Sequence, residues 1–275
     1  MHNSFARRSA PVAAFALALS LMACIPQPVE WAGDGDRVDA VLADSLRLVM
    51  APDAPNGVAF VPQWTPPTWP SEPNLCGATL RADRAPGDEA YASWFSVRDD
   101  SSVVLRVARS DDAGRTWNPA VNADTVDVGR AGCARPVPYI SADSLNGYVH
   151  IVYYLDAREG AGLFFTHTME RGALFHEPVP IVYGDRPANA AVASRGDTVA
   201  VVYEDPNSRL PRLGLALSRV QGHIFERRTS ASDDTGEARL PRIALQGTTL
   251  VIGWTSTGRG GTMPRTVIRS GTISW

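Results

Sequence analysis

The stretch Ser110-Asp111-Asp112-Ala113-Gly114-Arg115-Thr116-Trp117 decides the fold of this chain. Its residue types predict a tight turn between two strands. The Asp112 side chain can accept backbone N–H bonds, and Gly114 can adopt the positive φ that side chains resist. The ring of Trp117 would be buried as the next strand begins. The residues expected to have this structural role are Ser110, Asp112, Gly114, Thr116 and Trp117.

The same spacing recurs along the chain. A hydroxyl residue closes a strand-like run 21 to 23 residues after each turn glycine. The glycines are Gly87, Gly147, Gly196 and Gly247, and the hydroxyl residues are Ser110, Thr168, Ser218 and Ser270. The segments between them are rich in β-branched and aromatic residues, which favour strands. Self-similarity with a period of roughly 50 residues predicts a repeated antiparallel meander.

The stretch 110–117 resembles the Asp-box, Ser-x-Asp-x-Gly-x-Thr-Trp, of the BNR-repeat sialidase-like β-propeller superfamily. Degenerate versions follow in register at 168–175 and 218–225, whereas the fourth, at 270–275, lacks the glycine. The resemblance implies an all-β fold, namely a small β-propeller of about four antiparallel four-stranded repeats. We expect these repeats at approximately 76–127, 128–183, 184–236 and 237–275.

The fourth repeat ends before its outer strand is complete, which would expose a sheet edge. Because propellers commonly close with a strand from the opposite terminus, we expect Asp36 to Met50 to supply it. The seven prolines between Pro52 and Pro73 disfavour central strands, so residues 36–75 are expected to form a closing strand and an extended arm. The spacing leaves open whether the ring has four blades or a distorted fifth.

Residues 1–23 have the layout of a secretory signal, with Arg7 and Arg8 before an apolar run. Leu21-Met22-Ala23-Cys24 resembles the lipobox of bacterial lipoproteins, which implies acylation of Cys24 and attachment to a membrane through lipid. Residues 24–35 would be a tether. The expected location is the cell envelope, at the outer membrane or cell surface. The alternative is a soluble secreted protein with an incidental cysteine.

Composition excludes other classes of function. The formal net charge is −3, which disfavours binding to a nucleic-acid backbone. Neither a phosphate-binding glycine loop nor Cys-x-x-Cys is present, so no cofactor is expected. The histidines after residue 24 lack zinc-site spacing, so no metal site is expected; they are His150, His167, His176 and His223.

Cys76 and Cys133 are the two cysteines beyond the predicted anchor. In an exported protein such a pair favours a disulfide, and closing this loop would stabilise the fold by about 4 kcal/mol. The alternative is two unpaired buried thiols.

A binding site is expected on the face opposite the Asp-box turns, where the longer loops gather. The sialidase resemblance implies an arginine clamp for a carboxylate, a tyrosine–glutamate pair and an acid/base aspartate. The corresponding candidates are Arg135, Arg186 and Arg242 for the clamp, with Arg158 nearby, Tyr203 with Glu204, and Asp156 as acid. Tyr203 and Glu204 are neighbours on a strand, however, and should point to opposite faces.

The leading hypothesis is an exported, membrane-anchored propeller that binds a glycan or protein partner through this face. One alternative is an exo-acting, sialidase-like glycoside hydrolase. The other is a non-catalytic scaffold of the cell envelope. The sequence does not define an oligomeric state.

Overall fold

The computed structural model describes residues 27–38, 42–54, 56–233, 236–258 and 263–275. The predicted signal and Cys24 therefore lie outside the described residues. Apart from the short 3-10 helix Gly77–Thr79, the described chain is built from strands and their connections. Within these ranges, no helix has the length and apolar character needed to span a bilayer.

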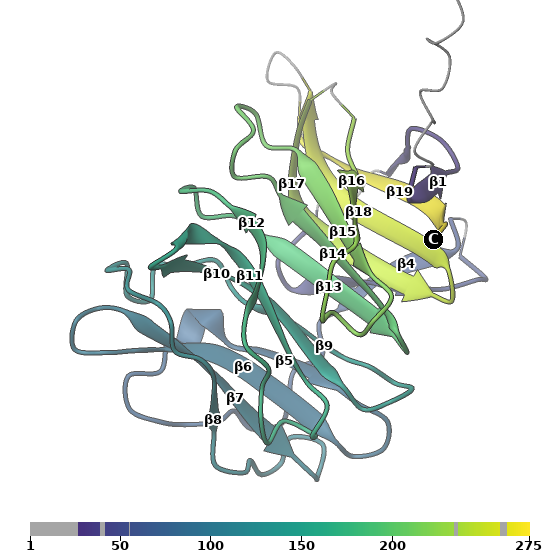
Figure 1. Ribbon diagram of the computed structural model, residues 1–275. Helices are drawn as coiled ribbons and strands as arrows, with labels where there is room; N and C mark the ends of the chain where they lie inside the picture. Colours follow the sequence, from purple (N-terminus) through teal and green to yellow (C-terminus); the bar gives the residue numbers. More distant parts are fainter. Residues whose placement is uncertain (1–26, 39–41, 55, 234–235, 259–262) are drawn as a thin grey trace, which may run out of the picture.

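Three four-stranded antiparallel sheets follow one another along the chain (Figure 1). The first contains β5 (Arg81–Arg84), β6 (Ala90–Val97), β7 (Val103–Ser110) and β8 (Val121–Asp124). The second contains β9 (Tyr139–Ala142), β10 (Val149–Ala157), β11 (Gly160–Thr168) and β12 (Val179–Tyr183). The third contains β13 (Ala190–Arg195), β14 (Thr198–Glu204), β15 (Leu213–Ser218) and β16 (Arg227–Ser230). The predicted all-β fold of four-stranded antiparallel units is confirmed.

The last sheet combines the two ends of the chain. β17 (Gly236–Gln246), β18 (Thr249–Gly258) and β19 (Arg265–Ile273) form a meander. β19 also pairs with β1 (Val29–Trp31) and with β2 (Asp36–Val38). Among the described residues of the segment 36–50, which was expected to cover this edge, residues 36–38 do so, and Val29–Trp31 lies before that segment.

The rest of that segment has another partner. β3 (Leu46–Met50) pairs with β4 (Val58–Pro62) in a separate two-stranded sheet. Leu48 and Val58 from this hairpin pack with Ala244 and Val251 of the last sheet. Alternation of apolar residues predicts a strand here, but it does not specify which edge the strand joins.

The inner strands of the sheets surround a common axis. β5 contacts β9, β9 contacts β13, β13 contacts β17, and β17 contacts β3. Between β3 and β5, Arg47 Nη1 lies 3.3 Å from Asp83 Oδ1. The second strands β6, β10 and β14 are buried along most of their length. Neighbouring sheets cover both faces of β10 and β14, whereas β6 packs against the second sheet on one face and against the N-terminal arm on the other.

The arm packs against the outside of the first sheet. Trp94 of β6 clusters with Trp64, Trp69 and Trp117, and its Nε1 donates a 2.8 Å hydrogen bond to Glu72. This contact explains why a proline-rich segment is ordered on the molecule without joining a four-stranded sheet.

The turn at 110–117 has the geometry that its residues predict. Ser110 Oγ accepts a hydrogen bond from Gly114 N at 2.8 Å, and Asp112 accepts from the backbone and hydroxyl of Thr116 at 2.8 and 2.7 Å. Gly114 has φ +81°, and a Cβ there would lie 2.6 Å from Pro66. Trp117 is half-buried, and its Nε1 donates to the Thr68 carbonyl at 2.9 Å.

Candidate functional site

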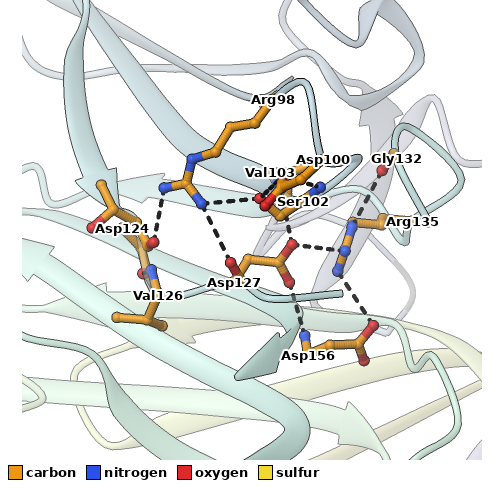
Figure 2. A network of polar contacts seen from close by, with 11 residues as sticks. Arg98, Asp100, Ser102, Val103, Asp124, Val126, Asp127, Gly132, Arg135 and Asp156 are labelled. Carbon is orange, nitrogen blue, oxygen red and sulfur yellow. Dashed lines mark hydrogen bonds and ion pairs between the residues drawn. The ribbon is translucent and has the colours of Figure 1, made fainter. Parts of the chain in front are cut away.

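The loop face comprises the connections after the second strand of each sheet and the connections between sheets. Figure 2 shows a polar network there that includes Arg135. The Arg135 side chain is 2% exposed, and its Nη2 lies 2.8 Å from Asp127 Oδ2. Asp127 also accepts backbone hydrogen bonds from Val103 at 2.8 Å and Asp156 at 3.0 Å. Arg135 is therefore held in a buried ion pair.

Asp156, the proposed acid, belongs to the same network. Its Oδ2 lies 3.9 Å from Arg135 Nη1 (Figure 2), and a Cβ on Gly129 would lie only 2.2 Å from it. The Cys76–Cys133 disulfide lies beside these residues, and Arg135 N donates to the Cys133 carbonyl at 2.9 Å. The disulfide joins the two cysteines that the sequence analysis paired.

The other two clamp arginines are occupied elsewhere. Arg186 donates to the Pro206 carbonyl from Nε at 3.0 Å and from Nη2 at 2.9 Å. Arg242 donates to the Leu46 carbonyl at 2.7 Å and to the Ala43 carbonyl at 3.1 Å. Among the interactions of the described residues, the three arginines share no partner, so the expected clamp does not form in this conformation.

Tyr203 and Glu204 point in different directions, as alternation along β14 requires. Tyr203 packs so closely on Gly214 that a Cβ there would lie 2.4 Å from its ring. Burial raises the pKa of Tyr203. Glu204 accepts from Asn189 Nδ2 at 3.1 Å and from Leu240 N at 2.8 Å. The nominated tyrosine–glutamate pair is thus not in contact, and Arg158 is an exposed residue.

Little space remains where the axis meets the loop face. A cavity of about 40 Å³ lies between residues that include Asp44, Arg81, Tyr139 and Arg242. Ligand pockets usually measure about 300–1,000 Å³, so this space is far smaller than a sugar-binding site requires.

A larger cavity opens at the other end of the axis. We call that end the turn face; it comprises the turns after the first strand of each sheet and the box-like turns. The two sets of turns are joined by backbone hydrogen bonds, such as Ala113 N to the Asp88 carbonyl at 2.6 Å. The axial cavity has a volume of about 440 Å³, within the usual range for ligand pockets.

The inner strands supply the polar side chains of the axial cavity. They include Arg47, Asp83, Tyr139, Ser141, Arg195 and Gln246, together with Gln63 after β4 and Ser144 in a turn. Tyr139 borders both cavities and therefore lies between them. This site could not be predicted from the sequence, because its residues are widely separated in the chain and each resembles an ordinary polar residue at a strand end.

Two buried polar atoms of residues that line the axial cavity lack protein partners. They are Arg47 Nε and Gln63 Oε1. Asp83 accepts a hydrogen bond from Ala142 N at 2.9 Å and pairs with Arg47, while burial raises the pKa of this carboxyl. Arg195 provides a second guanidinium. With two arginines and one carboxyl, the cavity favours a polar ligand that carries negative charge.

The chain matches no family model and no curated protein. Among solved structures, it is similar to a protein of unknown function from Dyadobacter fermentans. The identity is 13% and the TM-score 0.51, over 68% of this chain and 50% of that one. The Hadza microbial sialidase Hz136 has 16% identity and a TM-score of 0.48, over 71% and 46% of the two chains.

The NanB sialidase from Streptococcus pneumoniae has 10% identity and a TM-score of 0.46, over 70% and 49%. The chain thus spans about half the length of these three structures. At such identities the likeness concerns the fold alone. It carries no activity over to this chain.

Proposed function

We propose that the protein is a glycan-binding β-propeller that holds an acidic saccharide in the axial cavity at the turn face. The observation that carries the proposal is the lining of that cavity. Two arginines, Arg47 and Arg195, line its 440 Å³, and in the same lining the buried Arg47 Nε and Gln63 Oε1 lack protein partners. Leaving such groups without partners costs about 1–3 kcal/mol each, a cost that a bound polar molecule would remove once the two side chains turn these atoms toward the cavity.

The chemistry of the lining favours a saccharide that bears a carboxylate. Guanidinium groups can bind a carboxylate through two parallel hydrogen bonds. Serine hydroxyls and glutamine amides both donate and accept, which suits the several hydroxyls of a sugar. Such groups come from Ser141, Ser144, Gln63 and Gln246.

The number of carboxyl groups that line the axial cavity favours binding over hydrolysis. Glycoside hydrolases generally use two carboxyl groups about 5–10 Å apart. Asp83 is the one carboxyl among the described residues that line the axial cavity, and it is paired with Arg47. The glycoside hydrolase and the envelope scaffold remain the alternative functions. The ligand would then bind at the turn face and not at the loop face, where the sequence predicts it.

A pair of arginine substitutions tests which face binds. The labelled protein would be applied to a glycan array, and acidic hits would be measured by calorimetry with Arg195→Gln and Arg158→Gln variants. A hydrogen bond to a charged group contributes about 1.5–3 kcal/mol, so Arg195→Gln should weaken binding roughly 10- to 150-fold. Arg158→Gln, on the loop face, should leave the affinity within about twofold.

Weaker binding in Arg158→Gln, with unchanged binding in Arg195→Gln, would contradict the proposal and favour a site on the loop face. Absence of any acidic glycan hit would contradict glycan binding itself. The same preparation would be incubated with fluorogenic glycosides, including a sialoside. Turnover would favour the glycoside hydrolase instead.

We also propose that Cys24 is acylated and attaches the protein to the cell envelope. This part rests on the sequence Leu21-Met22-Ala23-Cys24 alone. Incorporation of labelled palmitate should be lost in Cys24→Ser, and the variant should move from the membrane fraction to the soluble fraction. Equal labelling of both proteins would refute acylation at this residue.

A further inference from the structure

Three histidines from two neighbouring sheets meet at the turn face. His167 lies in β11, His176 follows the box-like turn at 168–175, and His223 belongs to the turn at 218–225. One ring nitrogen of each lies within 4.8 Å of the others. His176 and His223 are exposed, whereas His167 is 1% exposed. The group is therefore accessible from solvent on one side and anchored in the core on the other.

Main-chain contacts hold the three residues in place. His176 N donates to the His167 carbonyl at 2.9 Å, and Thr166 Oγ1 donates to the His176 carbonyl at 2.7 Å. In the third sheet, Gly222 has φ +90°, and a Cβ there would lie 2.4 Å from the Phe165 ring. The turn that carries His223 is thus pressed against the strand that carries His167.

Two of the three rings, those of His167 and His223, have a nitrogen that is available to a metal ion. Both nitrogens of the buried His167 lack a partner, an arrangement that costs free energy unless something occupies the site. His223 Nδ1 lies 2.8 Å from the Val220 carbonyl. Because a carbonyl only accepts, Nδ1 carries the proton and the lone pair of Nε2 is available. A backbone carbonyl commonly orients a metal-binding histidine in this way.

We propose that His167, His176 and His223 bind one divalent transition-metal ion, with zinc as the first candidate. Neutral imidazole suits zinc, copper and nickel, and three protein ligands leave a coordination position open to solvent. In a tetrahedral zinc site, Zn–N distances of about 2.0–2.1 Å place the nitrogens roughly 3.3 Å apart. The exposed rings of His176 and His223 can rotate to close the difference while His167 stays in the core.

The rings also contact one another directly, and such contacts alone could explain why the three histidines cluster. His167 and His176 have centroids 4.4 Å apart with an interplanar angle of 23°. His167 and His223 have centroids 4.6 Å apart at 77°. A purely aromatic cluster predicts no uptake of metal, so the two explanations can be separated by experiment.

The test uses the purified protein after treatment with a chelator. Zn²⁺ binding would be measured by calorimetry in the parent, His176→Gln, His223→Gln and Ile224→Gln proteins. Ile224 is 62% exposed in the same turn as His223 and is a matched control. The two exposed histidines are chosen because their replacement leaves the core intact. We expect one ion per chain, at least tenfold weaker binding in either histidine variant, and no change in the control.

A second readout reports on the ligands themselves. Co²⁺ bound by the parent should give the intense visible absorption of a tetrahedral site, and His223→Gln should lose it. The proposal would be overturned if the parent took up no Zn²⁺, or if both histidine variants bound Zn²⁺ as tightly as the parent. Neither readout depends on glycan binding, so failure of the metal proposal would leave the proposed glycan binding unaffected.

Discussion

Replacing Arg135 by methionine distinguishes a structural arginine from a ligand-binding one. Methionine keeps much of the side-chain volume but leaves the carboxylate of Asp127, which is fully buried, without its cation. Breaking a buried ion pair from one side typically costs about 3–5 kcal/mol. For a domain of this size, 1 kcal/mol shifts Tm by about 2–4 °C, so Arg135→Met should lower Tm by roughly 6–20 °C.

The assay is thermal unfolding by calorimetry, with two further variants. The exposed Arg158→Ala should leave Tm almost unchanged. Arg135→Met/Asp127→Asn removes the uncompensated buried charge, but its single amide oxygen can accept only one of the two backbone hydrogen bonds, because Val103 N bonds to Asp127 Oδ2 and Asp156 N to Oδ1. The recovery should therefore be partial, about 0.5–3 kcal/mol of the loss. Unchanged stability of Arg135→Met together with lost glycan binding would refute the structural reading and restore Arg135 as a clamp residue.

Two further predictions concern the disulfide and the first box turn. Cys76→Ser/Cys133→Ser should lower the free energy of unfolding by about 4 kcal/mol, because the bridge closes a loop of 57 residues. The expected fall in Tm is roughly 8–16 °C. A reductant should cause the same fall in the parent and none in the variant. Hydrogen bonds from the backbone and hydroxyl of Thr116, and from Ser110, lower the pKa of Asp112 to about 2. Since the unfolded value is about 3.9, Asp112 contributes stability above that pH which is lost as the pH falls through 2. Asp112→Asn should therefore flatten the fall of Tm between about pH 4 and pH 2, whereas Asp53→Asn, at an exposed position, should leave that fall as it is in the parent. Equal slopes of Tm against pH in the two variants would contradict this account.

Residues near each other in the chain were predictable because their interactions are local. Ser110, Asp112, Gly114 and Thr116 satisfy one another within seven residues, and the positive φ of Gly114 follows from the same turn. Alternating apolar residues likewise indicated the strands. The edge that each strand joins was less predictable, as the pairing of β3 with β4 rather than β19 illustrates.

The candidate sites were harder to predict because they depend on contacts between sheets. Arg135 and Arg242 look like solvent-facing cations in the sequence, yet one pairs with buried Asp127 and the other donates to backbone carbonyls. A guanidinium has five donors, and nothing in the local sequence tells whether a ligand or the protein itself will satisfy them.

The sequence by itself determined the period of the chain, the all-β class and the geometry of the Asp112 turn, since turns and strands follow from backbone preferences and neighbouring side chains. The tertiary structure alone decided where ligands are proposed to bind. It lines the axial cavity with side chains such as Arg47 and Arg195, and it brings His167 of one sheet beside His223 of the next. The physical reason is that strand alternation assigns a side chain to a face of its sheet, whereas only the packing of one sheet against another determines what that side chain meets.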